Sequence, residues 1–459
     1  MTDGSGIFFD FYFPVLLMLL AGSALLHYIN TRRHNISNRD AEPTGAPDAS
    51  YEQFLRKYLM MYACAISADW IQGPYLYHLY ASAGLSHSDI TMLYMVSFQA
   101  SGIAGVFIGS LVTRVGHRLS ALAFCVIFSL SALLKLSKNF TILCCSSVLG
   151  GTAITLMHTV FDSWLIKEHH SRRCHPSLLS RAFSLESSLS SLVAVASSVL
   201  GSFLADEAGG LGLGPRSPFG AAVFILCVAA ALVVWTIPAD SCPDSVSEPD
   251  SFRAIFRSAW KSLATLRDAK LVCITQALFE SAMYMFVVLW NPVVLGRCRD
   301  TITYISSLGW IYAAFMVAMT IGSQIYAFLT SKRVHMYLIA TGTFTVASAA
   351  LLVATVISKM DTACAFAKND MRIAFLAFTL FEGMCGLYYP IIKDLKAQYF
   401  PAETRTGLMS LSRVGQNIII TILLLSTRFI RTSGILFLAS LCLCVVAFLQ
   451  GMFSGVHDE

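Results

Sequence analysis

An acidic residue, Asp69, lies in the middle of a membrane-length stretch that runs from about residue 55 to residue 80. A carboxylate at bilayer depth costs about 3 kcal/mol or more, so chains rarely carry one without a use for it. Gly73 and Pro74 follow closely and interrupt helical hydrogen bonding, which a membrane tolerates only where protein or a water-filled cavity satisfies the freed groups. These residues therefore predict a polar pathway through a membrane.

The elements that position such residues are predicted to be membrane-spanning helices. The chain has 459 residues, of which 56% are hydrophobic and 13% charged, whereas a soluble protein carries roughly a quarter charged residues. Apolar runs of about 20 residues recur almost end to end, and each can cross a ~30 Å hydrocarbon core as a helix. We therefore expect an all-α polytopic membrane protein. The candidate spans lie at about 7–29, 55–80, 90–112, 119–137, 140–165, 181–205, 217–237, 270–295, 303–329, 335–357, 371–392, 406–427 and 433–454.

The basic residues predict which loops face the cytoplasm. About two-thirds of the 32 Lys and Arg residues fall in alternate loops, and the positive-inside rule assigns those loops to the cytoplasm. This assignment places Lys135 and the glycosylation sequon at Asn139 on the opposite face. Basic residues follow the first span instead of preceding it, so we expect a retained anchor with its N-terminus outside.

A polar stretch divides the remaining twelve spans into two sets of six. Asp69 and Glu280 each occupy the first span of their set, which is one of several matches that indicate an internal repeat. The basic end of the polar stretch is typical of an amphipathic interfacial helix. We predict an N-terminal transmembrane anchor helix at 7–30, six-helix bundles at 55–237 and 269–455, and a cytoplasmic linker at 238–268.

The sequence also argues against several classes of protein. It contains no nucleophile–base pair, no nucleotide-binding loop and no metal-type spacing of cysteines, so we expect no enzyme activity, no metal, no cofactor and no ATP-driven step. No block of Lys and Arg resembles a nucleic-acid footprint. The expected surroundings are a lipid bilayer, and we expect a monomer.

We call the twelve spans that follow the anchor the core spans. The turn between the second and third core spans carries a first resemblance. Gly109-x3-Thr113-Arg114-Val115-Gly116-His117-Arg118 resembles the signature loop of the major facilitator superfamily. That loop needs glycine for a tight turn and arginine to pair with acidic groups and the negative ends of helices. Arg114 and Arg118 are therefore candidate gating residues, although Thr113 replaces the usual acid of the charge latch.

A second resemblance is more specific. Residues 68–80 read ADWIQGPYLYHLY and closely resemble the first core helix of the eukaryotic molybdate-anion transporter family, a branch of that superfamily. Further matches lie at 161–164, 276–281 and 385–390, and the similarity extends from about residue 58 to about 450. The resemblance implies a twelve-helix transporter core that moves molybdate by alternating access, with proton coupling left open. It brings no established set of substrate ligands with it.

Molybdate is a tetrahedral dianion, so its site needs positive charge and hydrogen-bond donors. Arg413 is the only arginine well inside a span, and its fork-like guanidinium suits an oxyanion. The alternative role of Arg413 is a structural ion pair with Glu186. Asn417, one turn further on, adds a donor. The neutral candidates for substrate contact are Gln72, Tyr75, Tyr77, Gln276, Asn291, Tyr388 and Tyr389.

The intramembrane carboxylates would repel a dianion and are candidates for coupling or gating instead. Asp69 and Glu280 can take up a proton that permits anion binding, or they can be structural partners of nearby amides and tyrosines. Glu382, near the middle of a later span, has the same two interpretations. Glu186 completes this group of candidate coupling residues.

Two other functions stay open from the sequence. A transporter of the same fold could carry another solute, such as an organic anion or sulfate, because a fold does not fix a substrate. A non-transporting membrane receptor or scaffold is the alternative from a different class. For the location of this multi-pass protein, we expect the plasma membrane ahead of an internal membrane.

Overall fold

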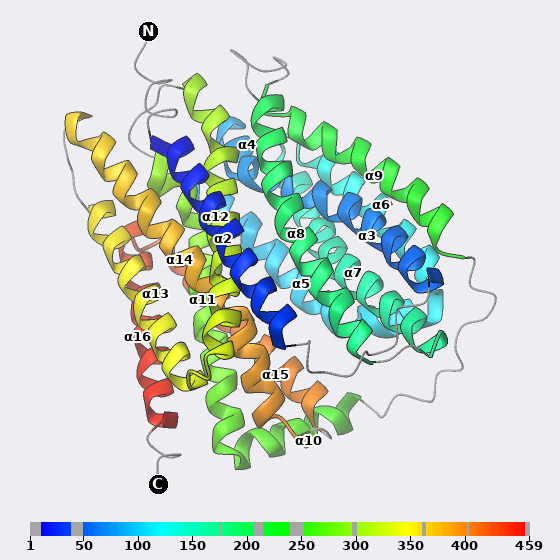
Figure 1. The fold of residues 1–459 in the computed structure, drawn as a ribbon. Coiled ribbons are helices and arrows are strands. Elements are labelled where there is room, and N and C mark those ends of the chain that lie inside the picture. Colours follow the sequence, from blue (N-terminus) through cyan, green and yellow to red (C-terminus); the bar gives the residue numbers. More distant parts are fainter. Residues whose placement is uncertain are drawn as a thin grey trace. The chain divides into compact units, whose positions relative to one another are not determined.

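The computed structural model describes residues 11–37, 49–173, 176–205, 214–238, 252–295, 301–359, 364–401 and 404–454. Within these ranges the regular structure is entirely helical (Figure 1). The helices are α2 (Phe13–Ser37), α3 (Ala49–Trp70), the 3-10 helix η2 (Gly73–Tyr75), α4 (Leu76–Ser82), α5 (His87–Val115), α6 (His117–Leu134), α7 (Phe140–Ser171), α8 (Pro176–Ala205), α9 (Ser217–Thr236), α10 (Phe252–Thr265), α11 (Arg267–Leu295), α12 (Thr301–Ser331), α13 (Met336–Lys359), α14 (Cys364–Tyr399), α15 (Arg405–Ser426) and α16 (Thr432–Ser454).

Among the described residues, 11 helices are long and apolar enough to cross a membrane. The expected span at 55–80 is not one of these because it is broken into α3, η2 and α4. The expected span at 406–427 is α15, whose apolar part, Leu411–Ser426, is shorter than the others. The predicted all-α polytopic class is confirmed.

The chain forms two compact units. The N-terminal unit contains α3 to α9 together with residues Ile305–Ala313 of α12. The C-terminal unit contains α2 as far as Asn35, α10, α11, the parts of α12 outside Ile305–Ala313, and α13 to α16. The domain limits expected from the sequence stay predictions.

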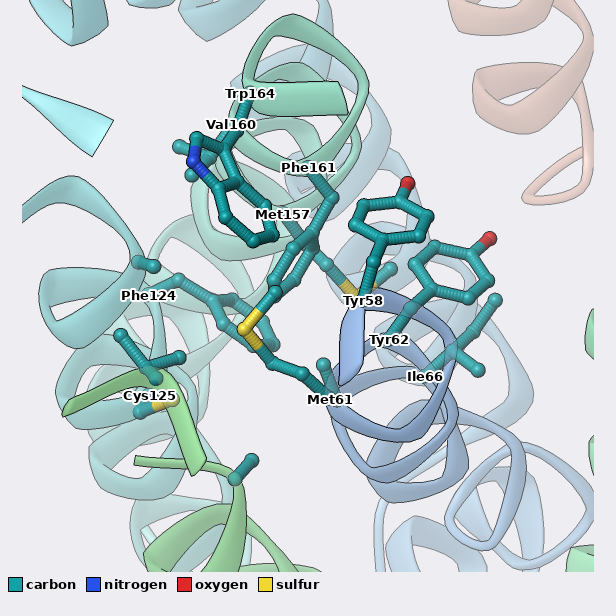
Figure 2. Packing of buried hydrophobic residues seen from close by; sticks show 14 of the residues in the cluster. Tyr58, Met61, Tyr62, Ile66, Phe124, Cys125, Met157, Val160, Phe161 and Trp164 are labelled. Carbon is teal, nitrogen blue, oxygen red and sulfur yellow. The ribbon is translucent and has the colours of Figure 1, made fainter. Parts of the chain in front are cut away.

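An aromatic cluster forms the core of the N-terminal unit, where α3, α6 and α7 meet (Figure 2). Phe161 packs edge-on against Tyr62 and Phe124, with ring centroids 6.0 and 6.3 Å apart. Tyr58 and Tyr62 stack one turn apart on α3, and Figure 2 shows both hydroxyl groups on the same side of the cluster. The apolar faces of α3, α6 and α7 therefore fix the direction of these two polar groups.

The first core helix is interrupted where the sequence predicts. α3 ends at Trp70, and Gly73, Pro74 and Tyr75 form the single 3-10 turn of η2 before α4 begins. A backbone group that the interruption frees is satisfied locally, since the backbone N–H of Gln72 donates to the backbone carbonyl of Asp69 at 3.1 Å. The interruption therefore leaves Asp69 and Gln72 at the end of a helix instead of within one.

Two further helices lie in the C-terminal unit. The expected anchor is α2, where the Asn30 side-chain amide donates to the Gln324 carbonyl of α12 at 3.0 Å. Tyr12, just before α2, packs edge-on against Phe375 of α14. The expected amphipathic helix is α10, which runs crosswise to the long helices at the ends of α11 and α15 (Figure 1). Its Trp260 and Lys261 are exposed.

Candidate functional site

A hydrogen-bonded cluster surrounds Glu280 of α11 in the C-terminal unit. The Tyr388 hydroxyl of α14 donates to Glu280 Oε1 at 2.9 Å. Tyr388 is fully buried and stacks on Phe279 with ring centroids 3.9 Å apart. Gln276, one turn before Glu280, forms a side-chain hydrogen bond with it and accepts one from Ser412 Oγ at 2.8 Å. Three helices thus hold the carboxylate in a defined position.

Two cations act on this carboxylate. Lys396 of α14 and Arg413 of α15 both interact electrostatically with Glu280 and with each other. Lys396 is half-buried, while Arg413 is exposed. Neither forms an ion pair with Glu280 among the residues that the structure describes, so both can still engage an added anion. We define Glu280, Lys396 and Arg413, with Gln276 and Tyr388, as the C-terminal charge cluster.

The N-terminal unit contains a smaller charged group at the interruption of its first helix. Lys135, directly after α6, donates to Gln72 Oε1 at 3.0 Å and interacts electrostatically with Asp69. Gln72 is buried and its side-chain amide donates to the Ala68 carbonyl at 2.7 Å. Both the oxygen and the nitrogen of the Gln72 side-chain amide are therefore hydrogen-bonded. Asp69 and Gln72 both interact with the Lys135 ammonium group.

Glu186 of α8 lies in a separate polar group of the N-terminal unit. It is buried, and its Oε2 accepts a 2.6 Å hydrogen bond from the Tyr58 hydroxyl. Tyr62 and Asp162 also lie within hydrogen-bonding range of the Glu186 carboxyl group. Glu186 is therefore anchored within its own unit, by residues of α3 and α7.

The remaining neutral candidates include three tyrosines that contact neighbouring side chains. Tyr75 is fully buried and donates to Ser202 Oγ at 3.2 Å. The Tyr77 hydroxyl hydrogen-bonds to His87 Nδ1 at 3.0 Å, and the Tyr389 hydroxyl donates to Met283 Sδ at 3.3 Å. None of these three hydrogen bonds is made to the C-terminal charge cluster or to the group formed by Asp69, Gln72 and Lys135.

Three other candidates differ in their exposure. Asn291 is almost completely buried, whereas Asn417 is half-buried one turn after Arg413 on α15. Glu382 is 6% exposed in α14. The proposed roles of these three residues stay predictions.

The turn between α5 and α6 has the expected glycine. Gly116 adopts a φ of 92°, in the left-handed region that favours glycine, and it joins the two helices directly. Thr113 donates to the Gly109 carbonyl at 3.5 Å within α5. Arg114 is exposed and Arg118 half-buried, and neither forms an ion pair among the described residues.

Sequence reasoning missed three charged residues of these groups. Lys135 and Lys396 follow apolar runs and count as loop cations by the positive-inside rule, whereas Asp162 belongs only to a family match. The available signal for Lys135 is its position between Leu134 and Leu136, which is unusual for a loop cation. Lys396 lies two turns after Tyr388 on the same helix, a spacing that places both residues on one face.

Comparison with solved structures defines the class of protein. The fold matches a mutant of the nucleoside transporter NupG with a TM-score of 0.67, at 10% identity, covering 87% of this chain and 98% of that one. A D-xylose–proton symporter matches with a TM-score of 0.64 at 11% identity, covering 88% of this chain and 97% of that one. At this identity the likeness concerns the fold alone. The protein is thus a multi-pass helical membrane protein with the major facilitator fold.

Sequence comparison identifies the family. Residues 11–381 match a family described as sugar transporters with 12 TM segments. A molybdate-anion transporter of Xenopus tropicalis is 31% identical over 408 residues, which cover 88% of this chain and 85% of that protein. One from Danio rerio is 28% identical over 417 residues, covering 86% and 83%. The chain belongs to the molybdate-anion transporter family of the major facilitator superfamily, and it is a membrane transporter and not an enzyme.

Proposed function

We propose that this protein is a secondary active transporter that moves molybdate across a membrane by alternating access, with protons as the coupling ion. The observation that carries the proposal is that Lys396 and Arg413 both interact electrostatically with Glu280. The relatives named molybdate-anion transporters supply the identity of the anion. A guanidinium and an ammonium together provide the donors and the charge that a tetrahedral dianion requires.

The charges of the cluster account for coupling. When Glu280 is ionised, the charges of Glu280, Lys396 and Arg413 add up to one net positive charge, which is too little to neutralise a dianion. When Glu280 takes up a proton, both cations are left uncompensated and their charge equals that of molybdate. Proton uptake at Glu280 and anion binding therefore favour each other, and this linkage is reciprocal. The proton would enter with the anion and leave from Glu280 after the anion has gone.

The neutral members of the cluster have positioning roles. Tyr388 and Gln276 both hydrogen-bond to Glu280, so the carboxyl group stays in place whether or not it carries a proton. Ser412 fixes the Gln276 amide, and Ser412 directly precedes Arg413 on α15. A movement of α15 would therefore change the position of Arg413 and the hydrogen bonds of Gln276 together.

Uptake of isotopically labelled molybdate into proteoliposomes tests this proposal. We expect saturable uptake by the full-length protein that tungstate inhibits and that an imposed proton gradient stimulates. Arg413→Gln and Lys396→Gln should each reduce uptake about tenfold or more, because each removes a charge-assisted contact. Glu280→Gln should retain exchange of molybdate but lose stimulation by the gradient. The absence of saturable molybdate flux in the wild-type protein would refute the proposal.

Lys332→Gln is the matched control for the two charge removals. Lys332 is exposed just after α12, and it is not among the groups that act on Glu280 or Lys396 in the described structure. Its neutralisation changes the net charge equally but should leave molybdate uptake unchanged. An equal loss in all three variants would point to net charge instead of a site.

A neutral sugar is the second candidate, because the matched family is described as sugar transporters. A sugar would be held by neutral hydrogen-bond donors and aromatic faces, so its flux should depend little on Lys396 and Arg413. Xylose and sulfate therefore serve as competitors in the same uptake assay. Inhibition by xylose with cation-independent flux would favour the sugar, whereas cation-dependent inhibition by sulfate would widen the specificity to oxyanions.

A further inference from the structure

Lys135 is a buried cation whose hydrogen-bonding capacity is largely unused. It caps the C-terminal end of α6 and its side chain is only 8% exposed. An ammonium group carries three donors. Within the described part of the chain, its one hydrogen-bond acceptor is Gln72 Oε1, at 3.0 Å. The remaining donors of this buried positive charge are thus available to an added acceptor.

The carboxylate that acts on Lys135 does not complete this site. Asp69 is the one charged group of the described residues that acts appreciably on Lys135, and Lys135 is the one that acts on Asp69. The two do not form an ion pair, since the ion pairs of the described residues are Arg172–Glu168 and Arg181–Glu52. A buried charge without an ion-pair partner is costly, and an anion bound at Lys135 would offset that cost.

The other neighbours stabilise the cation without accepting a conventional hydrogen bond from it. The rings of Phe128 and Phe219 have their centroids 5.5 and 5.9 Å from Lys135 Nζ, within the range of cation–π attraction. The negative end of α6 adds a further favourable field. Gln72 is held by its own hydrogen bond to the Ala68 carbonyl, so it fixes the ammonium in one place. The positive charge is therefore pre-positioned.

We propose that Lys135 binds a small inorganic oxyanion at a second site, in the N-terminal unit, with Gln72 holding the ammonium group in position. The unused donors would bind two oxygens of the anion. The Asp69 carboxylate and the anion would then be alternative counter-charges of one lysine, so protonation of Asp69 would favour the anion. That the anion is molybdate rests on the proposed function.

The position of Lys135 suggests what this site does. The charge pattern of the loops places Lys135 near the non-cytoplasmic ends of the helices, whereas Arg413 lies about two turns from a predicted cytoplasmic end. A weak first site near one side would raise the local concentration of the anion before it reaches the second. Lys135 and Arg413 would therefore bind the anion in sequence.

A purely structural role for Lys135 makes a different prediction. If Lys135 only compensates Asp69, then Lys135→Gln is harmful because Asp69 is left uncompensated, and adding Asp69→Asn restores the protein fully. If Lys135 binds an anion, the double variant folds but has lost that anion. The neutral pair Asp69→Asn with Lys135→Gln is thus the variant that separates the two roles.

Equilibrium dialysis of the full-length protein in detergent tests the proposal, with molybdate, tungstate and sulfate as separate probes. We expect two bound equivalents of molybdate in the wild type and one in the double neutral variant. Arg413→Gln combined with Lys396→Gln should keep the equivalent that depends on Lys135. Asp69→Asn alone should tighten binding at Lys135 about tenfold, because it removes the competing carboxylate. Lys138→Gln, three residues along and exposed, is the control and should change nothing.

The outcomes separate this proposal from the proposed function. One outcome is that molybdate uptake continues, the wild type binds one equivalent, and Lys135→Gln still binds it. This outcome would overturn the second site and keep the transport function. Binding of sulfate or tungstate that depends on Lys135, without any molybdate uptake, would support the site and overturn the assigned substrate. A folded double variant that still binds two equivalents would show that Lys135 is only structural.

Discussion

Tyr58 and Glu186 show how single residues fix a charge inside the N-terminal unit. Glu186 is 7% exposed and is held by the Tyr58 hydroxyl at 2.6 Å, with Tyr62 and Asp162 beside it. The stacking of Tyr58 on Tyr62 directs both hydroxyl groups to one side of the aromatic cluster (Figure 2). Residues of α3 and α7 therefore hold the Glu186 carboxyl group of α8 in one position.

Tyr58→Phe should therefore destabilise the protein. The variant keeps the ring and its packing but leaves the buried Glu186 carboxyl group without the 2.6 Å hydrogen bond from Tyr58, at a cost of about 1–3 kcal/mol. Thermal unfolding in detergent should show a lower midpoint than the wild type. Tyr28→Phe is the control, since Tyr28 is 61% exposed on α2. Equal midpoints for both variants would mean that the hydrogen bond contributes nothing measurable.

At the scale of elements, each unit contains a helix crossing that only glycine permits. In the N-terminal unit, a Cβ atom on Gly151 of α7 would overlap the Ser97 carbonyl of α5. In the C-terminal unit, a Cβ atom on Gly322 of α12 would overlap the Gly383 carbonyl of α14. Both crossings join the second and fourth core helices of their half. This agreement supports the internal repeat that the sequence indicates.

Gly151→Ala should weaken the contact between α5 and α7. The added methyl group meets backbone, which cannot rotate away, so the helices must separate at a cost of about 1–3 kcal/mol. Gly220→Ala is the matched control, because a Cβ atom on Gly220 of α9 meets nothing within 4 Å. We expect Gly220→Ala to be neutral or slightly stabilising. The comparison requires thermal unfolding of both variants. Similar unfolding midpoints would contradict the close approach of α5 and α7 at Gly151.

At the scale of the whole molecule, both units pair a carboxylate of their first core helix with a cation from a later part of the same unit. Asp69 of α3 interacts with Lys135, which follows α6, and Glu280 of α11 interacts with Lys396 of α14. Each carboxylate also has a glutamine near it in the sequence, Gln72 or Gln276. The repeated fold therefore contains two similar charged groups, one in each unit. This repetition is what makes two successive anion sites physically reasonable.

The orientation of the molecule can be tested directly. The distribution of Lys and Arg predicts an external N-terminus and a cytoplasmic linker at about 238–268. An epitope at the N-terminus should be stained on intact cells if the protein reaches the plasma membrane, whereas an epitope within the linker should need permeabilisation. Staining of the linker on intact cells would reverse the predicted orientation, and with it the order of the two anion sites.

The sequence by itself determined the class, the family and the interruption of the first core helix. Hydrophobic runs of membrane length, the chemistry of Gly73 and Pro74, and the ADWIQGPYLYHLY run are local signals, so one sequence suffices to interpret them. It also singled out Gln276, Glu280 and Arg413, because a polar group inside an apolar run is conspicuous.

Only the tertiary structure decided which of these residues act together. Gln276, Glu280, Tyr388 and Arg413 come from three helices, and a sequence gives the depth of a residue along its helix but not the neighbour that its face meets. The sequence alone counts Lys135 among the loop cations. It does not show that Lys135 is buried, because this burial depends on Gln72 and on α9, which pack around the end of α6. Which charged residues become neighbours depends on how the helices pack, and every helix of a unit contributes to that packing.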